Sequence, residues 1–188
     1  MNSSTEAYFA GVCKVEARSA LRRKPVKTKQ INVERLSIIS SKPFEEVVAK
    51  FEAAIGHPDM MVLWRDINST TTYAELEKVI QKVLGPTGFI QFVRFDMGAI
   101  MRKEIPTAPK SIRFLVGNPL IMKQMAVHVP DAASYAPVTI LIDERTDGVH
   151  LSYDRMASFL ATHGSPEALK VAKDLDSKVE ALLTAAAK

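Results

Sequence analysis

The sequence has one cysteine, few glycines and no long hydrophobic run. Because Cys13 is alone, an intramolecular disulfide and a multi-cysteine metal site are excluded, and such cysteine usage suits a reducing compartment. No apolar run approaches the roughly 18–20 residues that a membrane helix needs, and the N-terminus lacks the apolar core of a secretory signal. We therefore expect a cytoplasmic protein that does not span a membrane.

The common cofactor and metal motifs are also missing. Neither G-x-G-x-x-G nor G-x-x-x-x-G-K-[ST] occurs, so nucleotide binding through those glycine loops has no support. The four histidines, His57, His128, His150 and His163, show no metal-ligand spacing, and alternation in its strand predicts His150 at the surface. The sequence predicts no cofactor and no metal site.

Positive charge is concentrated at the N-terminus. Residues 1–30 contain seven basic and two acidic residues, a net charge of +5, which leaves 18 basic and 19 acidic residues, a net −1, for the rest. A neutral body argues against a nucleic-acid-binding face. We interpret residues 1–30 as a flexible basic arm, and a nuclear signal, a phosphate contact or part of an organelle presequence remain alternatives.

Residues 31–188 read as a single α+β domain. With 47% hydrophobic residues in the chain, this length is sufficient for one buried core. Apolar and β-branched patterns predict strands near 31–40, 88–96, 112–116, 138–143 and 149–153, and helices at 43–56, 72–85, from 119 and from 166. Residues 57–71 lack a regular period, so we expect a loop there.

Three short motifs fix the ends of these elements. Thr72 and Glu75 form a predicted capping box, and Asn118 can cap a helix whose first residue is Pro119. Asp147-Gly148 predicts a tight turn between two alternating strands, with positive φ at the glycine. The adjacent hairpin makes at least part of the sheet antiparallel.

The order of several motifs resembles one known family. They are Pro43–Gly56, Gly88-Phe89 through Asp96, Gly117-Asn118-Pro119, Pro137-Val138, Glu144, Asp147-Gly148 and Ser152-Tyr153. In this order they resemble the family called domain of unknown function 302, over roughly residues 31–160. The resemblance implies a β-α-β-β-β-β-α fold with a curved antiparallel sheet flanked by helices, in a class shared with TATA-binding-protein-like folds. A shared fold does not carry function across.

Two features depart from the family pattern. Many members have a histidine after the aspartate, where this chain has Asp96-Met97, so no role of that histidine transfers. Residues 57–86 look like an insertion that adds a helix, and insertions in small domains commonly build lids or partner surfaces.

Polar and methionine-rich positions supply the candidate site. Asp96, Glu144 and Tyr153 are candidates for moving a proton, although the same groups are equally suited to anchoring turns. Asn118 is a candidate ligand contact at a helix start, or simply a cap. Met61, Trp64, Met97 and Met101, together with Met122 and Met125, are candidates to line an adaptable apolar cavity. We expect Trp64 to pack against the domain body or a second subunit, over the region that contains Met97–Met101.

Two functions remain open at this point. The first is a non-enzymatic module, a homodimer or a carrier of a small apolar ligand, with nucleic acid and membranes not among its partners. The second is a cofactor-independent isomerase or hydrolase that acts on a small hydrophobic metabolite. The absence of a recognisable catalytic constellation favours the first function.

Overall fold

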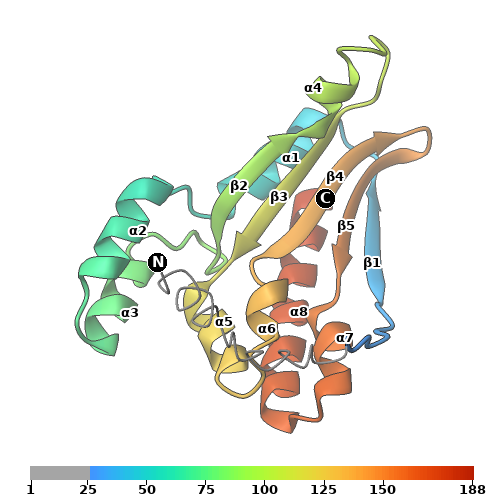
Figure 1. Ribbon diagram of the computed structural model, residues 1–188. Helices are drawn as coiled ribbons and strands as arrows, with labels where there is room; N and C mark the ends of the chain where they lie inside the picture. Colours follow the sequence, from blue (N-terminus) through green and yellow to red (C-terminus); the bar gives the residue numbers. More distant parts are fainter. Residues whose placement is uncertain (1–25) are drawn as a thin grey trace, which may run out of the picture. The chain divides into compact units, whose positions relative to one another are not determined.

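The computed structural model describes residues 26–188, and the N-terminal part that contains Cys13 lies outside them (Figure 1). The chain divides into Met1–Gln30 and a unit formed by Ile31–Lys188, and only the second is discussed below. Its strands are β1 (Arg35–Ser40), β2 (Ile90–Asp96), β3 (Ser111–Gly117), β4 (Val138–Arg145) and β5 (Gly148–Asp154). Its helices are α1 (Phe44–Ala53), α2 (Met60–Ser69), α3 (Tyr73–Gln81), α4 (Met97–Met101), α5 (Pro119–Ala126), α6 (Ala132–Tyr135), α7 (Met156–Leu160), the 3-10 turn η1 (Ala161–His163) and α8 (Pro166–Ala187).

The five strands form one antiparallel sheet in the order β1-β5-β4-β3-β2. This arrangement confirms the α+β class and the β-α-β-β-β-β-α succession of core elements, with further helices between them. β1 and β2 are the two edges. Between residues 26 and 188, no helix is both long and apolar enough to cross a bilayer.

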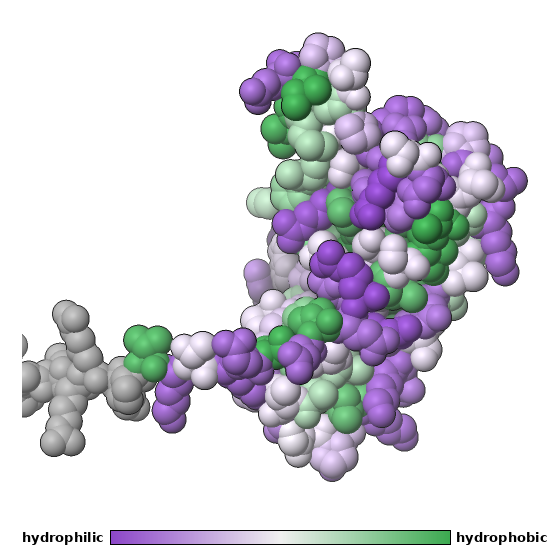
Figure 2. All heavy atoms as spheres, turned by 90° about the vertical axis from the view of Figure 1, so that its right-hand side faces the viewer, coloured by the Kyte–Doolittle hydropathy of each residue, from purple (hydrophilic) through white to green (hydrophobic). Residues whose placement is uncertain are grey.

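Helices cover one face of the sheet. In Figure 1, α1 and α8 lie behind the strands, and the buried core lies between them and the sheet. Alternation along each strand sends one set of side chains into this core, which includes Phe51, Phe114, Ile140, Leu151 and Leu175. The opposite face carries the intervening residues and has no helical layer over most of its area. α4 projects beyond the end of the sheet, and Figure 2 shows hydrophobic side chains on this tip.

The predicted caps are confirmed. The Thr72 side chain accepts a hydrogen bond from the Glu75 amide while the Glu75 carboxylate accepts one from the Thr72 amide, so the capping box is complete. Asn118 caps α5, with its Oδ1 accepting from the Leu120 amide at 2.9 Å and Pro119 in the first turn. These motifs need only residues two or three positions apart, and therefore the local sequence is sufficient to specify them.

Three local predictions are wrong. Residues 60–69 form helix α2 rather than a loop; the Asp59 carboxylate caps it by accepting from the Met61 and Val62 amides. Met60, Leu63 and Ile67 repeat at helical spacing and pack together, so the expectation of no regular period was wrong, although only Leu63 is fully buried. In the β4–β5 hairpin, Arg145 pairs with Gly148, so the turn consists of Thr146 and Asp147, one residue earlier than predicted, whereas the predicted positive φ at Gly148 is confirmed.

The third error concerns His150, which we expected at the surface. Its side chain is buried on the sheet face opposite the core, and its Nε2 lies 2.8 Å from Asp147 Oδ1. On this face its strand neighbours are Asp143 and Ile39, one on each side. Strand alternation correctly predicts on which face of the sheet His150 lies. Side chains of the neighbouring strands bury it there, and the local sequence pattern contains no information about them.

Candidate functional site

The hydroxyl of Tyr153 is held in a buried hydrogen-bond network. It donates to Asp176 Oδ1 at 2.6 Å and accepts from the Met156 amide at 3.1 Å. Asp176, on α8, also accepts from the Met156 amide at 2.7 Å and from the Ala157 amide at 3.1 Å. Burial, and then the neighbouring carboxyl group, raises the pKa of Tyr153 well above its usual value. The network joins β5 and α8 to the start of α7, where α7 has no cap of its own.

The two carboxylate candidates anchor chain segments near the ends of their strands. Asp96 caps α4, accepting from the Ala99 amide at 2.7 Å, and lies 3.6 Å from the Arg102 guanidinium. Glu144 accepts a long hydrogen bond, 3.4 Å, from the Lys110 amide beside β3. Both contacts are those of turn anchors, which was one of the two alternatives from the sequence.

The structure does not bring Asp96, Glu144 and Tyr153 together. Tyr153 pairs with Ile140, four residues before Glu144 on β4, and four residues of strand span about 13 Å. Asp96 is on the edge strand β2, two strands away from β4. Among the described residues, these three alternative candidates for moving a proton therefore lie at separate places and share no pocket.

An apolar cavity of about 150 Å³ lies elsewhere, beside the carboxyl end of β3. Its wall combines Trp64 of α2, Phe92 of β2, the Gly117-Asn118-Pro119 segment, three residues of α5, the Ala136–Val138 segment and Leu175 of α8. The three α5 residues are Ile121, Met122 and Met125. Trp64 and Phe92 meet with their ring centroids 6.5 Å apart. Trp64 remains 47% exposed, so the cavity opens to solvent at this ring.

Two local irregularities create this space. The ladder between β2 and β3 shifts register between Gln91 and Val93, which leaves Phe92 as the extra residue of a bulge, and bulges redirect side chains. Gly117 has no side chain, and a Cβ there would lie 3.4 Å from Pro137 and 3.6 Å from the Phe92 ring. A larger residue at position 117 would therefore fill the cavity.

The one amide side chain in the cavity wall is held by the backbone. Asn118 Oδ1 accepts from the Leu120 amide, and its Nδ2 donates to the Gly88 carbonyl at 2.9 Å. Besides this amide, the indole N–H of Trp64 is the other polar side-chain group of the wall. The cavity therefore offers van der Waals contact from aromatic and methionine side chains and no group suited to acid–base chemistry.

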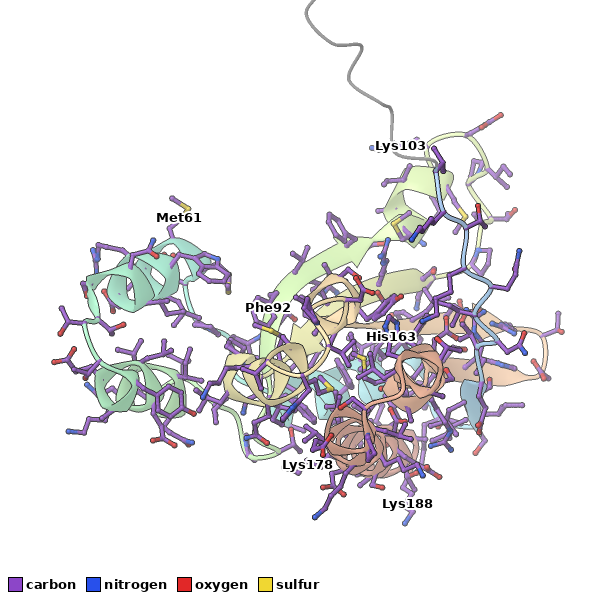
Figure 3. The ribbon with its side chains drawn as sticks, turned by 60° about the horizontal axis from the view of Figure 1, so that its bottom comes forward. Met61, Phe92, Lys103, His163, Lys178 and Lys188 are labelled. Carbon is purple, nitrogen blue, oxygen red and sulfur yellow. The ribbon has the colours of Figure 1, made fainter. Side chains whose placement is uncertain are left out.

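The structure places only some of the predicted ligand contacts at the cavity. Trp64 and Asn118 line the cavity, whereas Met61 is 81% exposed and points outward from α2 in Figure 3. Met97 and Met101 are on α4, at the other end of β2, so the expected packing of Trp64 over Met97–Met101 does not occur within one chain. Phe92 takes that place against the indole.

Sequence reasoning included Met122 and Met125 in an apolar cavity but missed Phe92, Gly117 and Leu175. The one available signal was Phe92 itself, an aromatic residue in a strand with apolar side chains on both faces, which is the pattern that a bulge produces. Within residues 26–188, no group of three or more metal-ligating side chains is close enough to hold an ion.

The comparisons with known proteins agree with this fold. The chain is similar to the crystal structure of an uncharacterized conserved protein DUF302 from Bacillus stearothermophilus, with a TM-score of 0.57 and 10% sequence identity, covering 81% of this chain and 97% of that one. At this identity the likeness concerns the fold alone. No curated protein matches the chain significantly. A family model matches residues 65–186, and the chain therefore belongs to the family described as Domain of unknown function DUF302.

Proposed function

We propose that this protein binds a small apolar molecule in the cavity beside Gly117. The observation that carries the proposal is the wall itself: apart from the indole N–H of Trp64, every lining side chain is apolar except Asn118, whose amide is held by two hydrogen bonds to the backbone. Water gains few hydrogen bonds in such a cavity, so an apolar occupant displaces it at little cost.

The size of the cavity limits the ligand. A volume of about 150 Å³ corresponds to a molecule of benzene size, since apolar cavities near ~150 Å³ take such ligands. With roughly six to eight non-hydrogen atoms, we expect a dissociation constant of about 0.1–1 mM for a simple aromatic hydrocarbon.

Toluene titration tests the proposal directly. Toluene should shift the methyl NMR signals of Met122 and Met125 and, at ten times its dissociation constant, stabilise the fold by about 1.4 kcal/mol. Gly117→Val should abolish both effects because the valine side chain occupies the cavity. Ala133→Val, which places a valine on the exposed surface of α6, is the control and should bind as the original protein does. Unchanged toluene binding by Gly117→Val would refute the proposal.

The alternative enzymatic function receives no specific support from the geometry. Asp96 faces a separate charged depression in which three carboxylates and three cations lie together, among them the ion pair of Glu52 with Arg94 at 2.8 Å. None of the three proton-transfer candidates lines the apolar cavity. We therefore propose binding rather than catalysis.

Self-association is the second part of the proposed function. The specific observation is an apolar surface on α4 and the end of β2, where Phe95, Ile100 and Met101 are exposed together. Surfaces of this kind on soluble proteins usually contact a partner. We propose that the protein forms a homodimer. We also propose, from its cysteine usage alone, that it works in the reducing cytoplasm.

A further inference from the structure

The free edge of β2 is available to a second molecule. β2 is the last strand of the sheet, and on its outer side the described chain supplies backbone hydrogen bonds only near its start, where Gly56 and Gly85 donate to the Phe89 carbonyl and the Gln91 amide donates to Gly56. Proteins protect exposed edges with proline, charged side chains, bulges or covering loops. The segment that follows the bulge, residues 93–96, has neither proline nor lysine, and its one basic side chain, Arg94, is paired with Glu52.

The apolar surface next to this edge is unusually concentrated. Phe95, Met97, Ile100, Met101 and Ile105 are all exposed, and they follow one another from the end of β2 through α4 and its loop. Ile100 alone keeps 65% of its surface in solvent. The tip is visible at the top of Figures 1 and 2, clear of the helical layer.

The two ends of β2 carry complementary features. Phe92 and its contact Trp64, at the cavity mouth, are near the start of the strand, and α4 follows its end directly. Arg94 lies midway along the free segment. A two-fold axis near it would place the start of β2 in one copy opposite the end of β2 in the other. Such an isologous arrangement places α4 of each copy against α2 of the other.

We propose that a second copy of this chain docks along β2, and that its α4 covers the cavity mouth at Trp64. The inference rests on the proposed function, because the partner's Met97 and Met101 complete the wall of the same cavity. These are the methionines that the sequence groups with Trp64 and that one chain keeps at opposite ends of β2. In the dimer they meet between copies.

The charges of the two contacting segments have opposite signs. Residues 97–109 contain Arg102, Lys103 and one acid, Glu104, a net charge of +1. Residues 59–81, which form α2 and α3, contain four acidic and two basic residues, a net charge of −2. Each copy thus presents a basic tip to the acidic helix pair of the other, which favours this pairing over a tip-to-tip contact.

Oligomeric state tests the interface in the full chain. By light scattering with size-exclusion chromatography, the protein should be a dimer at micromolar concentration, and Ile100→Glu should weaken dimerisation at least about tenfold. Val127→Glu is a matched control, since Val127, the residue that follows α5, is 64% exposed and lies outside the proposed interface. Both variants should keep the far-UV circular dichroism spectrum of the original protein, which shows that they fold. A monomeric protein, or a dimer unaffected by Ile100→Glu, overturns the proposal.

Cross-linking tests the geometry. In a Cys13→Ser background, Met61→Cys and Met101→Cys proteins are mixed and treated with a short bis-maleimide. The expected product is a mixed dimer linked through positions 61 and 101, formed faster than either homodimeric product. A product linked mainly through two copies of position 101 would mean a tip-to-tip contact and would overturn the arrangement.

Ligand binding separates this proposal from the preceding one. If both hold, Ile100→Glu lowers toluene affinity several-fold, and Gly117→Val abolishes binding while the dimer persists. If the cavity binds nothing, the scattering and cross-linking results still report on the dimer. If toluene binds equally well to the original protein and to a monomeric Ile100→Glu variant, the cavity is complete in one chain and the closure by α4 is wrong.

Discussion

Replacing Asp176 by leucine removes an acceptor shared by three buried donors. Asp176 is 3% exposed on α8 and accepts from the Tyr153 hydroxyl and from the Met156 and Ala157 amides. After the substitution the Met156 amide keeps the Tyr153 oxygen as an acceptor at 3.1 Å. The Tyr153 hydroxyl and the Ala157 amide lose their partner.

The magnitude follows from these two orphaned donors. Each buried donor without a partner costs about 1–3 kcal/mol, so the loss is about 2–6 kcal/mol. A buried leucine returns about 1.5–3 kcal/mol through its apolar surface. Because the Ala157 amide is only partly buried, we expect a net destabilisation of about 1–2 kcal/mol for Asp176→Leu, and of about 1 kcal/mol for Asp176→Asn, which keeps one acceptor oxygen.

Urea unfolding followed by circular dichroism measures these differences. Asp174→Leu, two residues earlier on the exposed side of α8, is the control and should change stability by less than about 0.5 kcal/mol. An Asp176→Leu protein as stable as the original, or more stable, would refute the reasoning. That result would mean that leucine packing outweighs the lost hydrogen bonds, as happens at some buried polar sites.

Three further predictions concern single positions. Gly148→Val should destabilise by roughly 1–3 kcal/mol in urea melts, because Gly148 has φ +138° and a Cβ there would lie 2.7 Å from the Ser40 carbonyl oxygen; neutral behaviour would contradict this. Because burial raises the pKa of Tyr153, the unfolded chain loses that proton first as pH rises past about 10, and stability should fall by about 1.4 kcal/mol per pH unit there. Tyr153→Phe should remove this part of the alkaline slope, and an identical slope in both proteins would count against it. The fluorescence of Trp64, the only tryptophan, should shift to shorter wavelength and resist iodide quenching when toluene binds, and a spectrum insensitive to toluene would place the ligand elsewhere.

Local chemistry made part of the fold predictable. The capping box at Thr72 and the Asn118 cap with Pro119 depend on groups within one helical turn, and the alternation of Val138–Arg145 with Gly148–Asp154 fixes a hairpin between neighbouring strands. In each case the residues that interact are close in sequence, so their identity and spacing carry the information.

Helix α2 marks the limit of this reasoning. Leu63 is its one fully buried residue, and the partly buried Met60 and Ile67 pack with it at helical spacing. The exposed Met61 and Val62 lie between these positions and hide the stripe from a periodicity argument. The Asp59 cap was readable in principle, because Asp before Met60 is a common helix start.

The sequence by itself determined the class, the order of the elements and their caps, because those follow from periodicity and from contacts a few residues apart. Only the tertiary structure decided which polar and apolar groups meet. It joined Asp176 to Tyr153 across 23 positions, and it set Trp64 against Phe92 and the α5 methionines instead of Met97 and Met101. The reason is physical: these contacts depend on how the strands are registered and how the helices pack on them, and on a one-residue bulge at Phe92, which redirects a side chain from one face to another.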